Sequence, residues 1–82
     1  YDSQNSLREH DYQLILQFYE QLIFEKEGHM PDSELHFLLR MYCRGSIAMT
    51  VDWVLTGMKL TPSELAALLT EAIPPKLAEI LL

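Results

Sequence analysis

Residues 33–57 carry apolar side chains on every side when they are drawn as an α-helix, and this pattern constrains the fold more than any other feature. At about 100° per residue, the apolar positions fall on three faces. The first face holds Leu35, Leu38, Tyr42, Gly45, Met49 and Trp53; the second holds Phe37, Met41, Ala48 and Leu55; the third holds Leu39, Cys43, Ile47 and Val54. A helix that is apolar on all sides is a buried helix. A monomer of three or four helices cannot enclose one of them completely, so we expect a second molecule to cover part of this segment.

The size of the chain sharpens the same problem. Its 82 residues predict a single domain over residues 1–82. A domain this small buries only roughly 60% of the surface that its unfolded chain exposes. Because 49% of the residues are hydrophobic, we expect surplus apolar surface, and a second copy of the same chain is the simplest cover for it.

Composition argues against several functions. The net charge is −6 and the six Lys and Arg residues are scattered, which disfavours a surface that binds nucleic acid directly. No stretch of about 18 residues is free of charge and apolar, so we expect no membrane span. Cys43 is the single cysteine and cannot form an internal disulfide. The sequence begins at Tyr1 without a methionine or a signal peptide, so we expect a fragment or a processed chain.

Glycine and proline residues divide the chain into segments with helical patterns, and no segment shows the alternation of apolar and polar residues that is typical of a β-strand. We therefore predict an all-α fold of three to four helices. The first helix is predicted from Ser6 to Glu27, with Gly28 as its left-handed C-cap. Ser6 followed by Glu9 fits a capping box at its start.

The later boundaries follow from the same signals. The second helix is predicted to begin at Asp32 or Ser33 and to end at Gly57. Pro74-Pro75 interrupts the chain after the third helix, and residues 76–82 can resume as a short fourth helix.

The third helix, residues 61–72, has the clearest start signal. Thr61 supplies an N-cap oxygen, Pro62 takes the first helical position, and Glu64 reaches back to complete a capping box. Its apolar stripe consists of Leu65, Leu68, Leu69 and Ala72.

Two pairs of candidate metal ligands lie four residues apart, Glu25 with His29 and Asp32 with His36. Gly28 interrupts the first pair, and the sequence contains neither a His-Glu-x-x-His motif nor a cysteine cluster. We interpret these residues as solvated surface groups and expect no metal and no cofactor.

Cys43 is the most obvious nucleophile, but His36, the nearest possible base, is two helical turns away. A buried cysteine among apolar neighbours behaves as a small inert hydrophobic residue. The sequence also lacks a phosphate-binding loop and a hydrolase nucleophile motif. We therefore expect that the protein is not an enzyme.

His36, Arg40 and Arg44 form a polar file on the apolar second segment. We expect them to face solvent or to pair with acidic residues, in preference to binding an anionic effector or a partner's carboxylate. Gly45 and Ala48 lie almost one turn apart, and small residues at this spacing let two helices approach closely. That approach is expected either within the chain or at a two-fold axis.

The stretch Met41 to Gly57 resembles the C-terminal domain of TetR-type transcriptional regulators. The resemblance is to a subgroup with the pattern Y-x-x-G-x-x-G-x-x-x-x-W-x-x-x-G, followed by a Pro-x-Glu-Leu helix start. The matching residues are Tyr42, Gly45, Trp53, Gly57, Pro62, Glu64 and Leu65. Ala48 stands where the subgroup has a second glycine, and the motif spans about a third of the chain.

The resemblance implies a cytoplasmic regulator whose last two long helices form a four-helix bundle with a second copy in a homodimer. It also implies an N-terminal helix-turn-helix domain that binds operator DNA, and no such domain is visible in residues 1–82. An apolar small-molecule effector is a further expected partner.

The resemblance and the apolar faces together place the dimer contacts on residues 33–56 and 62–72. The residues expected at the interface are Met41, Gly45, Ala48, Asp52, Leu55, Leu65, Leu68 and Leu69. The expected wall of an effector pocket consists of Tyr42, Met49 and Trp53, although ordinary core packing explains such aromatic residues equally well. The alternative function is a ligand-free helical module that binds a different protein.

Overall fold

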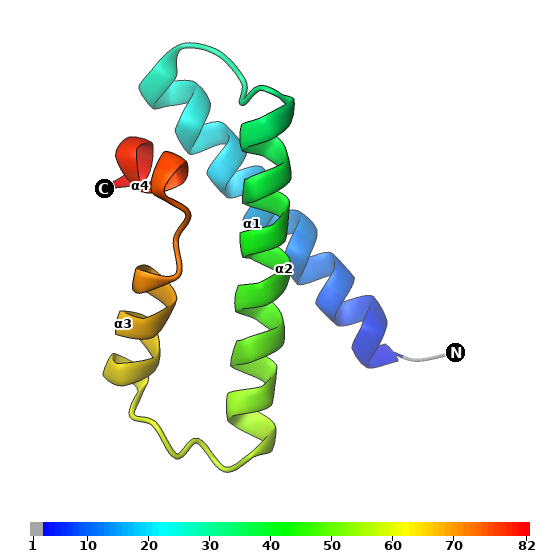
Figure 1. Cartoon of the computed structure of the whole chain (residues 1–82). Coiled ribbons are helices and arrows are strands. Elements are labelled where there is room, and N and C mark those ends of the chain that lie inside the picture. Colours follow the sequence, from blue (N-terminus) through cyan, green and yellow to red (C-terminus); the bar gives the residue numbers. More distant parts are fainter. Residues whose placement is uncertain (1–2) are drawn as a thin grey trace.

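The computed structural model describes residues 3–82, with side chains from Arg8 onward, and that part of the chain is helical without any β-strand (Figure 1). The predicted all-α fold is therefore confirmed. Its four helices are α1 (Ser3–Glu27), α2 (Ser33–Leu55), α3 (Pro62–Glu71) and α4 (Pro75–Leu81).

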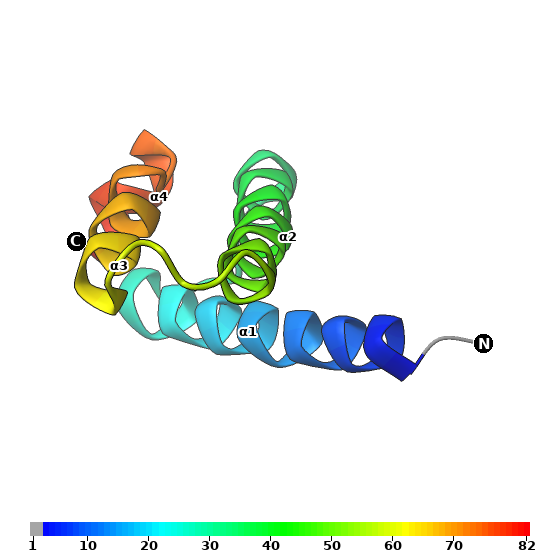
Figure 2. The same ribbon diagram turned by 90° about the horizontal axis from the view of Figure 1, so that it is seen from below.

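The helices form a thin molecule of two layers. α1 crosses behind α2, α4 packs against both, and α3 runs antiparallel to α2 at a greater distance (Figures 1 and 2). The Cα atoms span 40 × 33 × 18 Å. Because a helix with its side chains is about 10–12 Å across, the shortest dimension accommodates no third layer. One side of α2 is consequently left uncovered within a single chain.

The N-terminal boundary of α1 differs from the prediction. The helix begins at Ser3, so Ser6 lies inside it and the capping box predicted for Ser6 and Glu9 is wrong. The Glu9 carboxylate instead accepts a hydrogen bond from Arg44 at 2.7 Å, an interaction between residues far apart in sequence that local pattern does not reveal. The predicted end is confirmed, since Gly28 has a φ of 80° directly after Glu27.

Both ends of α2 follow the predicted signals. Asp32 is the N-cap and accepts a hydrogen bond from the Leu35 backbone nitrogen at 2.8 Å. At the other end, Gly57 and Met58 have φ values of 96° and 53°. The left-handed turn lets the Met58 nitrogen donate to the Trp53 carbonyl at 2.8 Å, which satisfies a free carbonyl at the end of the helix.

The predicted capping box of α3 is confirmed in full. The Thr61 nitrogen donates to the Glu64 carboxylate at 2.8 Å, and the Glu64 nitrogen donates to the Thr61 hydroxyl at 3.1 Å. The helical structure is then interrupted before Pro74, and α4 begins at Pro75, one residue before the predicted start.

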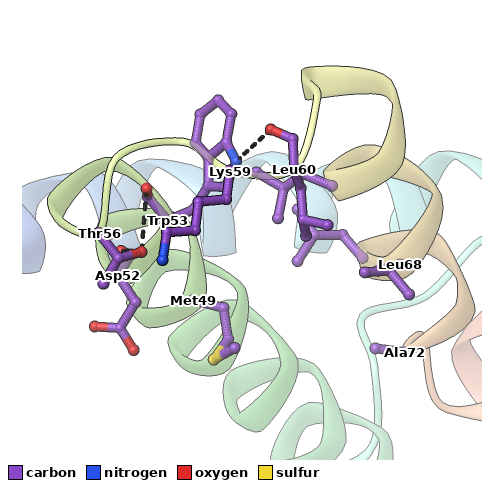
Figure 3. A pocket seen from close by; sticks show the side chains of 10 residues that line it. Met49, Asp52, Trp53, Thr56, Lys59, Leu60, Leu68 and Ala72 are labelled. Carbon is purple, nitrogen blue, oxygen red and sulfur yellow. Dashed lines mark hydrogen bonds between the residues drawn. The ribbon is translucent and has the colours of Figure 1, made fainter.

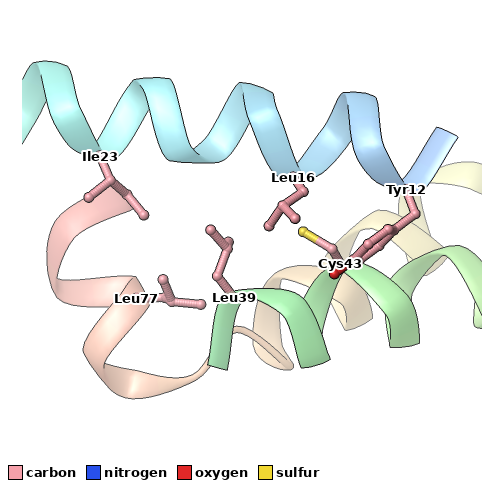
Figure 4. Packing of buried hydrophobic residues seen from close by; sticks show 6 residues of the cluster. All are labelled: Tyr12, Leu16, Ile23, Leu39, Cys43 and Leu77. Carbon is pink, nitrogen blue, oxygen red and sulfur yellow. The ribbon is translucent and has the colours of Figure 1, made fainter. Parts of the chain in front are cut away.

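The hydrophobic core is a narrow seam where α1, α2 and α4 meet (Figure 4). Its buried members are Tyr12, Leu16, Ile23, Leu39, Cys43 and Leu77. On α2 only Leu39 and Cys43 are fully buried, although the helix is apolar on all sides. Phe37, Met41, Met49, Val54 and Leu55 of α2 remain more than half exposed, so part of its apolar surface is not covered by the rest of the chain.

Replacing Leu39 with alanine removes a side chain that is 0% exposed at the centre of this seam. We expect the free energy of unfolding to fall by about 2–5 kcal/mol, the usual cost of a buried leucine. Leu14→Ala is the matched control, because Leu14 is 52% exposed. Urea denaturation followed by circular dichroism measures both, and equal losses in the two variants would contradict this core.

Candidate dimer interface and apolar groove

A stripe of exposed apolar side chains runs along α2 on the side opposite its buried residues, and the Tyr12 side chain of α1 borders it. Leu39 and Cys43 point toward α1, and residues about half a helical turn away point in the opposite direction. In this stripe Phe37 is 54% exposed, Met41 59% and Leu55 68%. Ala48 lies between them and is also exposed. All four residues of the second predicted face of this helix are thus exposed.

A groove of about 370 Å³ separates α2 from α3 (Figure 3). Its wall on α2 includes Met49 and Trp53, and its wall on α3 is the predicted leucine stripe. The full lining is Met49, Asp52, Trp53, Thr56, Lys59, Leu60, Leu65, Leu68, Leu69 and Ala72. The polar members gather at the end of the groove near the α2–α3 loop, so the remainder is suited to apolar side chains or an apolar ligand.

Two hydrogen bonds from aromatic side chains hold the walls of this groove in place. The Trp53 indole nitrogen donates to the Leu60 carbonyl at 2.8 Å and fixes the loop that precedes α3 (Figure 3). The Tyr42 hydroxyl donates to the Leu69 carbonyl at 2.7 Å near the other end of α3. Burial raises the pKa of the Tyr42 hydroxyl above its ordinary value, so this group stays protonated as a donor.

The residues predicted for the interface fall in two neighbouring places. Asp52 and the three leucines of α3 line the groove. Met41, Gly45 and Ala48 line an adjoining surface hollow on α2, and Leu55 is exposed near the end of that helix.

The predicted pocket wall is not separate from the predicted dimer interface. Met49 and Trp53 line the same groove as the predicted interface leucines. Tyr42 lies closer to the core, where it contributes to a crevice with Tyr19 and Ile15 of α1. The contribution of the Leu60 carbonyl to the site was not predicted, because a backbone acceptor leaves no pattern in the residue types.

Gly45 is not in close contact with another helix of the same chain. A Cβ atom added at Gly45 would meet no atom of another helix within 4 Å. Of the two predicted alternatives, a close crossing within the chain is therefore excluded at this position, and a crossing at a two-fold axis stays a prediction. Space beside Gly45 lies open on the side of the exposed stripe.

Two of the three residues of the polar file on α2, His36 and Arg44, pair with acidic residues of α1, as expected. His36 Nε2 lies 2.9 Å from a Glu20 carboxylate oxygen, and Arg44 pairs with Glu9. The guanidinium of Arg44 holds the pKa of the Glu9 carboxyl below its usual range, aided by a hydrogen bond from Gln13. Arg40 instead lies over the Phe37 ring, with its guanidinium carbon 5.8 Å from the ring centre.

The side chains considered as a nucleophile or as metal ligands are buried or interact with other groups of the chain. Cys43 is fully buried, and burial, with a smaller effect from the charge of Glu20, raises the pKa of its thiol to about 11. His29 Nδ1 lies 2.9 Å from the Met30 carbonyl, and His36 is paired with Glu20. Among the residues described, no three His, Cys, Asp or Glu side chains gather where they could hold a metal ion.

Residues 3–82 thus form a thin helical domain with an exposed apolar stripe and an adjoining groove. Residues 1–74 match the family described as the transcriptional regulator C-terminal region of the TetR type, and the chain belongs to this family. Helix α4 lies beyond the matched region. Comparisons with curated proteins and with solved structures found no significant match. Within residues 3–82, no helix is both long enough and apolar enough to cross a membrane.

Replacing Tyr42 with phenylalanine removes the donor to the Leu69 carbonyl while it keeps the ring. We expect a loss of about 1 kcal/mol in the free energy of unfolding. We also expect faster hydrogen exchange of the α3 amides, because the helix is held to α2 by few contacts. Exchange measured by mass spectrometry should leave α1 unchanged, and unchanged exchange in α3 would contradict the role of this hydrogen bond.

The buried Cys43 thiol predicts a specific pH dependence. Its pKa is raised from the ordinary value of 9.0 to about 11, so the folded state keeps the proton more tightly than the unfolded state. The resulting stability is fully present below about pH 9 and is lost as the pH rises toward 11. Denaturation across this range should give a flatter pH profile for Cys43→Ala than for the parent chain. Parallel profiles would show that the thiol is not buried.

Proposed function

We propose that this domain forms the homodimer of a TetR-type transcriptional regulator, with contacts from α2 and α3. The observation that carries the proposal is the exposed apolar stripe of α2, which is continuous with the α2–α3 groove. Met41 of the stripe and the neighbouring Gly45 also line a depression with Leu69 of α3 and with Ala72, the C-cap of that helix. The two apolar surfaces are therefore one extended face, larger than the isolated apolar residues common on protein surfaces.

The geometry of this face suits a four-helix bundle. In a two-fold arrangement the same patch is used by both protomers, so the α2 stripe of each copy can lie over the groove of the other. α2 has 23 residues, which gives it a length of about 35 Å. Ala48 of the stripe and the neighbouring Gly45 line one hollow and leave room for a second helix to approach closely.

DNA binding is proposed to belong to a helix-turn-helix domain outside residues 1–82. The dimer would then set the distance between two DNA-reading domains, which must match the spacing of the operator half-sites. An effector that prefers one arrangement of the dimer would shift the population toward it and change operator affinity.

An apolar small molecule in the groove is the second candidate function. It is favoured by the lining between Met49, Trp53 and Leu68, which is apolar on both walls. Because the same residues are proposed to contact the second copy, ligand binding and dimerisation would be linked. A different protein could also cover this face, and the oligomeric state of the purified chain separates that alternative from the homodimer.

Sedimentation velocity of the purified chain tests the homodimer at micromolar concentration, where we expect a two-fold species. Ala48→Glu and Leu68→Glu each place a charge without a partner in the proposed interface, and we expect both to give monomers. Ala67→Glu is the matched control, since Ala67 is exposed on α3 and lies outside the groove lining.

The single tryptophan offers an independent readout. Trp53 lies in the groove, so its emission should shift to the red when dilution separates the protomers. A parent chain that stays monomeric at all accessible concentrations would overturn the proposal. Glu variants that remain dimeric would show that another face is used.

A further inference from the structure

Arg44 makes two contacts that attach the N-terminal half of α1 to α2. Its guanidinium carbon lies 3.6 Å from the centre of the Tyr12 ring, a close cation–π arrangement. Its two terminal nitrogens also donate to the two Glu9 carboxylate oxygens, at 2.7 and 3.4 Å. The planar guanidinium can bind a carboxylate and stack on a ring at the same time, which lysine cannot do.

The contacts lie where α1 begins to extend beyond α2. Toward its N-terminus, α1 projects past the edge of α2 (Figure 2). Tyr12 is the first residue of the buried core along the chain, at 4% exposure. Arg44 covers the outer side of this ring, so it secures the last core contact before α1 leaves the body of the domain.

Arg44 also borders the proposed dimer face. It lines the same hollow as Met41, Gly45 and Ala48. The side chain is 55% exposed, and a Cβ at Gly45 would meet no neighbour within 4 Å. Because side chains on a helix lean toward its N-terminus, an arginine without its partners can lay its apolar stem over Met41 at the edge of this hollow, as long charged side chains do on apolar surfaces.

We propose that Arg44 is a positioning residue that couples the docking of the N-terminal half of α1 to dimerisation. Glu9 and Tyr12 hold the guanidinium at the edge of the hollow and keep Met41, Gly45 and Ala48 uncovered for the second copy. When α1 lifts away from α2, Arg44 is released and covers part of that surface. The inference rests on the proposed homodimer, because it assigns a control to the same face.

Glu9→Gln tests this coupling from a residue that does not line the hollow. We expect the dimer dissociation constant to rise about three- to tenfold, because a weaker hold on Arg44 lowers the fraction of free protomers whose hollow is uncovered, and each dimer needs two of them. We also expect faster hydrogen exchange of the amides of residues 8–15. Glu25→Gln is the matched control: it makes the same charge change on the same helix, where Glu25 bonds to Gln21 of α1. It should alter neither quantity.

Salt and a conservative variant distinguish coupling from a general loss of stability. High salt screens exposed ion pairs, so the difference between the parent and Glu9→Gln should disappear as salt increases. Arg44→Lys keeps the charge but loses the planar guanidinium that stacks on Tyr12 and binds both oxygens of Glu9. We expect its dimer dissociation constant to lie between those of the parent chain and Glu9→Gln.

The outcomes separate the two proposals. A parent chain that is monomeric overturns the homodimer and this inference with it. A parent dimer whose dissociation constant is unchanged by Glu9→Gln overturns the coupling alone, whether or not hydrogen exchange in α1 increases.

Discussion

The fold depends on how α2 is covered. α1 crosses it on one side and α4 packs at its N-terminal end, which together bury Leu39 and Cys43. The opposite side keeps its apolar residues exposed because the molecule is only 18 Å thick in its shortest dimension. Burial of apolar surface is the dominant favourable contribution to both folding and association. An uncovered apolar side on the central helix therefore links the stability of the chain to the association that we propose.

The attachment of α3 keeps a groove beside that uncovered side. Tyr42 and Trp53 each donate one hydrogen bond to a backbone carbonyl of the segment that contains α3. These bonds fix where the helix lies without filling the space between it and α2. Apolar residues on both walls consequently remain available to another molecule, while the capping box of Thr61 and Glu64 holds the start of the helix locally.

Local chemistry was predictable from the sequence, and contacts between distant residues were not. The ends of the helices at Gly28 and Gly57, and the capping box at Thr61, follow from rules that involve neighbouring residues. The start of α1 was misplaced because Ser6 and Glu9 fit a capping box by local pattern, whereas the helix begins at Ser3 and Glu9 pairs with Arg44 of a different helix. The candidate site shows the same division. The apolar stripes of α2 and α3 were predicted by periodicity, whereas their meeting in one groove depends on two bonds to backbone carbonyls, which residue identity does not encode.

That the predicted pocket and interface share one groove has a thermodynamic consequence under the proposed function. Anything that binds one state of a linked equilibrium shifts the equilibrium toward that state. A ligand that fills the groove where the second copy would insert its side chains must favour the monomer. A ligand that fits only the space left between Met49, Trp53 and the partner must favour the dimer. Whether an effector favours the monomer or the dimer therefore depends on how much of the groove the second copy occupies. Substitutions that make the groove smaller should change which of the two states an effector favours before they destabilise the fold.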